Sequence, residues 1–75
     1  MTGDDLIDRF LARLLREQGG TRRRWRNVLG AVRVYSAATH AHCNWSITPT
    51  GSAADVAAVE AVSDALRSEY PILVT

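Results

Sequence analysis

Lysine is absent from this sequence, and cysteine occurs only once, at Cys43. A single cysteine excludes a disulfide within the chain, which is the usual cross-link of small secreted domains. The sequence also lacks the run of roughly 18 apolar residues that a membrane span needs, and its N-terminal residues are acidic where a signal peptide is basic. We therefore expect a cytoplasmic protein that makes no contact with a membrane.

In place of lysine, all nine basic residues are arginine. Arginine suits contacts with phosphates, carboxylates and protein interfaces, because its planar guanidinium binds oxygen atoms in pairs. The eleven alanines favour a simpler interpretation, in which the base composition of the coding sequence accounts for both residue types. The absence of lysine therefore does not by itself indicate a function.

The chain of 75 residues contains 47% hydrophobic and 23% charged residues, which are the proportions of a globular protein. We expect a single small domain over residues 1–75. One core below roughly 80 residues rarely supplies ample stability, and this chain has neither a disulfide nor a recognised metal motif. Oligomerisation is the remaining common device, so we expect a homodimer with two-fold symmetry.

The net charge of +1 hides an uneven distribution. Residues 19–50 carry five arginines and no acidic residue, whereas residues 51–75 carry four acidic residues against one arginine. The middle of the chain is therefore basic and its end is acidic.

Hydrophobic periodicity predicts a helix at each end of the chain. Residues 4–18 repeat apolar side chains at helical spacing, behind a capping-box pair formed by Thr2 and Asp5. Gly19 and Gly20 then end this helix, because glycine accepts a left-handed backbone at a helix C-terminus.

The second helix is predicted between Ser52 and Pro71. Its valines form one stripe and its alanines an adjacent one, so it can pack against a sheet and against another helix. The residues after Pro71 fit either a short edge strand or a tail laid over the core.

Residues 22–38 fit both a strand and a helix. We predict a strand, because Gly30 would lie inside the helix and three arginines would open its first turn. Residues 42–48 alternate apolar and polar side chains, which indicates a half-buried strand with Trp45 in the core. A wide turn over residues 38–41 would join the two strands as a hairpin.

The predicted fold is therefore an α+β helix–hairpin–helix. A two-stranded hairpin alone is marginally stable. Two copies related by a two-fold axis would share a four-stranded antiparallel sheet covered by helices.

A basic cluster around an indole is the first candidate site. Its arginines could clamp the phosphates of a nucleic acid while the indole stacks on a base. The simpler interpretation is that the acidic second helix neutralises these arginines, and the low net charge favours it. The cluster comprises Arg22, Arg23, Arg24, Trp25, Arg26 and Arg33.

A second candidate is a polar face carrying His40, His42 and Asn44, next to Cys43. Zinc needs three or four ligands in tetrahedral arrangement, and Cys43 points to the opposite face of the predicted strand. The spacing matches no recognised zinc motif. We therefore predict no metal and place Cys43 in the core.

No Gly-rich phosphate loop, HExxH zinc motif or GxSxG nucleophile motif occurs in the sequence. We predict a non-catalytic interaction or accessory protein that acts as a homodimer and needs no cofactor. The first alternative is a nucleic-acid-binding module that uses residues 22–26. The second is a metal or thiol site around His40, His42 and Cys43.

Overall fold

The structure is a computed structural model that describes residues 1–74. Within this range the chain forms a small α+β fold, in which a two-stranded antiparallel sheet lies between the second and third helices along the chain. The elements are α1 (Gly3–Gln18), α2 (Arg22–Leu29), β1 (Val32–Val34), β2 (Trp45–Ile47) and α3 (Ala53–Glu69).

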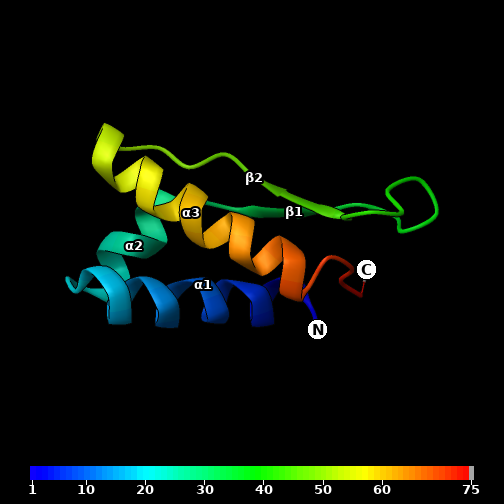
Figure 1. Cartoon of the computed structure of the whole chain (residues 1–75), viewed down its shortest axis with the longest axis horizontal. Coiled ribbons are helices and arrows are strands. Elements are labelled where there is room, and N and C mark those ends of the chain that lie inside the picture. Colours follow the sequence, from blue (N-terminus) through cyan, green and yellow to red (C-terminus); the bar gives the residue numbers. More distant parts are fainter. Residues whose placement is uncertain (75) are drawn as a thin grey trace.

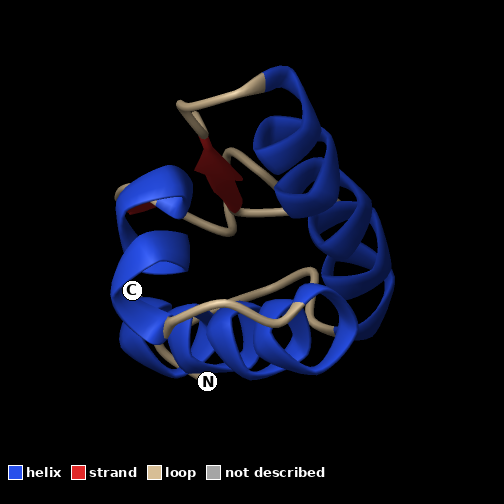
Figure 2. Ribbon diagram, turned by 90° about the vertical axis from the view of Figure 1, so that its left-hand side faces the viewer, coloured by secondary structure: helices blue, strands red, loops and turns tan. Residues whose placement is uncertain are grey.

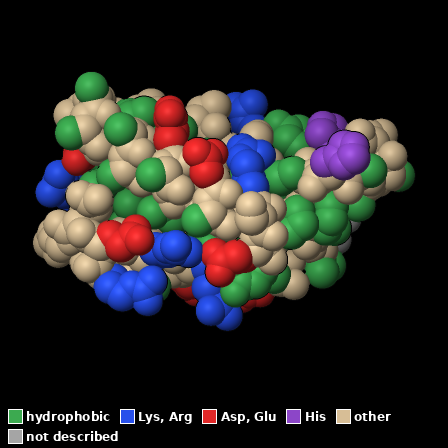
Figure 3. All heavy atoms as spheres, in the orientation of Figure 1, with side chains coloured by type: hydrophobic (Ala, Val, Ile, Leu, Met, Phe, Trp, Pro, Cys, Tyr) green, Lys and Arg blue, Asp and Glu red, His purple; other side chains and the backbone are tan. Residues whose placement is uncertain are grey.

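The helices and the hairpin are arranged around one core of apolar side chains. α1 packs against α2 and α3 and also contacts β1 of the hairpin (Figures 1 and 2). The molecule extends 36 Å along its longest axis, because the tip of the hairpin projects beyond the helices (Figure 1). Both histidines lie at this projecting end (Figure 3).

The prediction for α1 is confirmed. The Thr2 hydroxyl accepts a hydrogen bond from the Asp5 N–H group at 3.3 Å, and the Asp5 carboxylate accepts one from the Thr2 N–H group at 3.0 Å. These two bonds form the expected capping box. The bond from the Thr2 backbone lowers the pKa of Asp5 below its ordinary value. At the other end, Gly19 adopts φ 73° and ends the helix.

The predicted strand over residues 22–38 is wrong for most of its length. Arg22–Leu29 forms the helix α2, and only Val32–Val34 forms a strand. The Thr21 hydroxyl caps the helix by accepting from the Arg24 N–H group at 3.2 Å. Gly30 follows the last helical residue with φ 69°, so it ends the helix and does not weaken its interior.

The hairpin and the burial of Trp45 are confirmed, although β2 is shorter than the predicted strand over residues 42–48. The Trp45 side chain is 1% exposed. Its ring packs edge to face against the ring of Phe10, with the two ring centroids 5.8 Å apart. Its Nε1–H donates to the Tyr70 carbonyl at 2.8 Å. This residue therefore joins the hairpin to both α1 and the end of α3.

The C-terminal segment is a tail laid over the core. Among its residues, Leu73 is buried at 2% exposure, while Ile72 and Val74 are exposed. The Pro71 carbonyl accepts from the Asn44 N–H group at 3.0 Å, and the Val74 N–H group donates to the Met1 carbonyl at 2.9 Å. The tail thus lies between the hairpin and the N-terminus of α1 (Figure 1).

Within residues 1–74, none of the helices combines the length and the apolar character that crossing a bilayer would require.

Candidate functional site

The basic cluster predicted from the sequence divides into two parts in the structure. Arg22, Arg23 and Arg26 line a shallow hollow of about 430 Å³, together with Leu11 of α1. All three arginines are exposed, and they share one side of α2 because residues three and four apart are neighbours on a helix. Among residues 1–74, no acidic side chain lines this hollow. Arg33, on β1, is not one of its lining residues.

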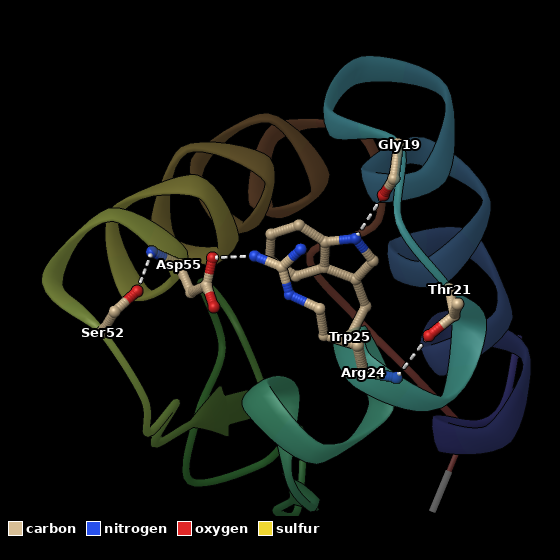
Figure 4. A network of polar contacts seen from close by, with 6 residues as sticks. All are labelled: Gly19, Thr21, Arg24, Trp25, Ser52 and Asp55. Atoms are coloured by element: carbon tan, nitrogen blue, oxygen red, sulfur yellow. Dashed lines mark hydrogen bonds and ion pairs between the residues drawn. The ribbon is translucent and has the colours of Figure 1, made fainter.

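Arg24 points to the opposite side, toward α3 (Figure 4). Its Nη2 lies 2.7 Å from the Asp55 carboxylate, and its guanidinium carbon lies 4.9 Å from the centroid of the Trp25 ring. Asp55 is itself held at the first turn of α3, where its N–H group donates to the Ser52 hydroxyl at 3.1 Å. This contact matches the interpretation that the acidic second half of the chain neutralises the basic segment.

The indole of Trp25 is not placed as the strand prediction required. Its side chain is 2% exposed, and its Nε1–H donates to the Gly19 carbonyl at 2.7 Å (Figure 4). A buried ring cannot stack on a nucleic-acid base, so the expected surface of arginines around an accessible indole is not formed. The tryptophan instead anchors α2 in the core, with Val28 and Leu29.

Two acidic residues neutralise part of the cluster, one from the second predicted helix, as expected, and one from α1 that the sequence did not single out. Asp8 of α1 pairs with Arg22, and Asp55 of α3 pairs with Arg24. Among residues 1–74, Arg23 and Arg26 form no such pair. Charge excess over residues 19–50 was the available signal, but the identity of the partners depends on helix packing.

The structure does not bring the side chains of His40, His42 and Cys43 together into one site. His40 stacks on Tyr35 with ring centroids 4.5 Å apart, and its Nδ1 bonds the Thr39 hydroxyl at 2.9 Å. His42 is exposed. The described part of the chain contains no group of three His, Cys, Asp or Glu side chains that could hold a metal ion.

Cys43 is half-buried and contacts a residue that sequence reasoning missed. The Arg67 Nη1–H donates to its Sγ at 3.3 Å, and the same guanidinium lies 4.6 Å from the centroid of the Trp45 ring. The Cys43 thiol in turn donates to the Trp45 carbonyl at 3.5 Å. These contacts fix the end of the hairpin against α3.

Asn44 was predicted on the polar face with His40 and His42, and this placement is wrong. The residue is fully buried, and its side chain bonds the backbone of Tyr35 and Leu73. It is therefore unavailable to a ligand on the outer face of the sheet. The possible ligand face is reduced to two exposed histidines near the hairpin tip.

The two outer edges of the sheet differ. On the edge of β2, the Arg67 guanidinium donates to the Trp45 carbonyl at 3.4 Å, while the outward N–H groups of Trp45 and Ile47 and the Ile47 carbonyl donate or accept no hydrogen bond within residues 1–74. The Tyr35 N–H group donates to the Asn44 carbonyl at 2.7 Å. In an antiparallel pair, successive residues of a strand point their backbone groups alternately toward the partner strand and away from it. The backbone groups of Val32 and Val34 therefore point outward, away from β2. No hydrogen bond from residues 1–74 closes this edge of β1.

Comparison of the chain with protein-family models, with curated proteins and with solved structures finds no match. The function is therefore argued from the geometry alone.

Proposed function

We propose that this chain is an interaction protein that works as a homodimer, in which the β1 strands of two copies pair antiparallel across a two-fold axis. The observation that carries this proposal is the outer edge of β1, whose outward backbone groups all lack a partner within residues 1–74, whereas on the outer edge of β2 the Trp45 carbonyl accepts from Arg67. Unpaired N–H and C=O groups at a sheet edge are a template for another strand. Pairing would extend the two-stranded hairpin to four strands, in which each hairpin gains support that it lacks alone.

Side-chain charge selects the register of the proposed pairing. A two-fold axis at Arg33 would set this arginine directly opposite its own copy, and like charges opposite one another destabilise a sheet. An axis at Val34 sets Arg33 opposite Tyr35 of the second copy. The Tyr35 ring lies on the outer face, where its hydroxyl bonds Ser46 at 3.1 Å. A guanidinium over this ring would contribute about 0.5–1 kcal/mol.

The proposed interface is short, because β1 contains three residues. Interfaces below roughly 1,200 Å² belong to weak or transient complexes. We therefore expect a dimer that forms in the micromolar range. Such a dimer can exchange its second copy for the strand of another protein, which is how an interaction module would use the same edge.

The test is amide hydrogen exchange at several protein concentrations, with light scattering on the same samples. Light scattering should approach twice the monomer mass of 8.2 kDa. The Val32 and Val34 amides should become protected as concentration rises, while the Trp45 and Ile47 amides, on the edge that takes no part in the proposed pairing, should not change. A monomer mass with rapid Val34 exchange up to the highest concentration would refute the dimer.

A pair of variants separates pairing from general stability. Val34→Pro removes an outward N–H group from the outer edge of β1, and Ile47→Pro removes an outward N–H group from the outer edge of β2. Both replace a half-buried apolar residue, so we expect similar losses of stability. Only Val34→Pro should abolish dimerisation. An equal loss of dimer in both variants would mean that the β1 edge is not the interface.

A further inference from the structure

We infer that the exposed arginines of α2 form a binding site for the phosphate groups of a nucleic-acid backbone. This site would bind nucleic acids without distinguishing their base sequences. The site consists of Arg22, Arg23 and Arg26 around the hollow above Leu11. It lies on a different element from the β1 edge and does not depend on the dimer.

The charge at this site is not balanced within the described chain. Arg23 and Arg26 form no ion pair with residues 1–74, and Arg22 has Asp8 as its only acidic partner. Like charges three and four residues apart on a helix repel one another. An anion in the hollow would reduce this repulsion, and guanidinium groups bind phosphate oxygens in pairs.

The Arg22–Asp8 pair does not block the site. Its side chains are 58% and 65% exposed, and an ion pair of this kind contributes about 0–1 kcal/mol. A phosphate can therefore compete for Arg22 at little cost. Arg24 is excluded from the site because Asp55 and the Trp25 ring hold it on the other side of α2.

The surroundings of the arginines favour a nucleic acid over an acidic protein. Protein interfaces have an apolar centre, but Leu11, the one apolar residue that lines the hollow, is only 1% exposed, so the apolar surface there comes from the methylene stems of the arginines. Binding to a phosphate backbone rests on charge and needs no such centre. The hollow is shallow, which suits an extended polyanion better than a small molecule that must be enclosed.

The same surroundings argue against a lipid membrane. Peripheral membrane binding combines basic residues with apolar side chains that enter the bilayer. The large exposed hydrophobic residues of the described chain are Ile72 and Val74, in the C-terminal tail. The tail and α2 lie at opposite ends of the molecule (Figure 1).

Burial of Trp25 defines how the nucleic acid is read. With no accessible aromatic ring in the cluster, bases cannot stack on it, and contacts with phosphates alone carry no sequence information. We therefore expect equal affinity for duplexes of the same length and different sequence. The affinity should fall steeply with salt, by about 0.9 log unit per phosphate contact for each log unit of salt, so with a slope of roughly −2 to −3 for three arginines.

The experiment measures the anisotropy of a fluorescently labelled DNA duplex with the full chain across a salt series. The variant Arg23→Gln/Arg26→Gln should weaken binding and reduce the log–log salt slope by about 1.8, which corresponds to two lost contacts. The control Arg9→Gln/Arg16→Gln removes the same charge from exposed positions of α1 and should leave both quantities nearly unchanged. Equal losses in the two variants would show general charge attraction and overturn the site.

A second measurement does not depend on any variant. In an NMR titration of the unmodified chain with the duplex, the amide shifts should change around residues 22–26 and not in the C-terminal tail. Vesicles containing anionic lipid and a polyglutamate peptide are tested in parallel. Absence of duplex binding at low salt, or tighter binding to either of these probes than to the duplex, would overturn the inference.

Discussion

The side-chain amide of Asn44 forms two hydrogen bonds with the backbone of Leu73. Its Nδ2–H donates to the Leu73 carbonyl at 2.7 Å, and its Oδ1 accepts from the Leu73 N–H group at 2.6 Å. The same Nδ2 also donates to the Tyr35 carbonyl at 3.0 Å. One buried amide thus satisfies backbone groups on the first arm of the hairpin and on the tail, as a peptide group in a third strand would.

Removal of this amide should destabilise the fold strongly. Asn44→Ala leaves the Leu73 backbone groups buried without partners, and each such group costs about 1–3 kcal/mol. We expect a loss of roughly 3 kcal/mol in the free energy of unfolding, measured by urea denaturation. Asn27→Ala, at an exposed position of α2, is the control and should stay within about 0.5 kcal/mol of the unmodified protein. Equal stability of both variants would contradict this role of Asn44.

Truncation of Trp45 should have a comparable effect. Trp45→Ala removes a fully buried ring that contacts Phe10 and the Tyr70 carbonyl, and such large-to-small changes cost about 3–5 kcal/mol. With Trp25→Phe as background, the fluorescence of the remaining tryptophan should show the short-wavelength emission of a buried indole. Emission like that of free tryptophan in water would show that Trp45 is exposed, and that the register in which β2 pairs with β1 is therefore wrong.

The ion pair between Arg24 and Asp55 should contribute modestly and in a salt-dependent way. Arg24→Gln also removes the guanidinium from the Trp25 ring, so we expect a loss of about 1 kcal/mol at low salt that shrinks at high salt. Arg23→Gln removes the same charge from an exposed residue with no acidic partner within residues 1–74, and stability should not fall, because this variant also relieves the repulsion from Arg26. A double-mutant cycle with Asp55→Asn measures the coupling, and a value of zero would disprove the interaction.

The capping box of α1 should make stability depend on pH in the acid range. The bond from the Thr2 N–H group lowers the pKa of Asp5 in the folded state below its ordinary value of 3.8. The stability that the ionised Asp5 carboxylate contributes is therefore complete above pH 3.8. This stability is lost as the pH falls through the lower pKa that Asp5 has in the folded state. We expect the stability difference between the unmodified protein and Asp5→Asn to shrink as the pH falls below about 3.8.

Asp4→Asn provides the comparison for this pH effect. Asp4 lies in the same first turn of α1, but it takes no part in the capping box. Thermal unfolding at each pH should therefore show a smaller pH-dependent difference for Asp4→Asn than for Asp5→Asn. Indistinguishable pH profiles for the two variants would assign the effect to the helix dipole and not to the capping bond.

Sequence reasoning succeeded where the determining residues are close together along the chain. The apolar repeat, Thr2, Asp5 and Gly19 define α1 within one segment, and the alternation around Trp45 places that ring in the core. For residues 22–29 the same local information was misread. Thr21 and Gly30 are the two caps of a short helix, and Trp25 is spaced three and four residues from Val28 and Leu29.

The candidate sites were less predictable because their geometry depends on distant partners. The arginines at the start of α2 counted against a helix, yet Asp8 and Asp55 from two other helices offset part of their charge. Asn44 has the alternation of a surface residue, but its partner Leu73 lies 29 residues away. Neither contact has a signature in the local pattern of polar and apolar residues.

The hydrogen bond between Val74 and Met1 brings the two ends of the described chain together. A circular permutant could therefore join these ends by a short linker and open the backbone in the exposed turn at residues 37–39. Tyr35 and Asn44, now nine residues apart, would then lie near opposite ends of the permuted chain. Because folding slows as contacts become more distant in sequence, the permutant should reach the same native contacts more slowly. The present order of segments therefore makes closure of the hairpin a local and rapid event.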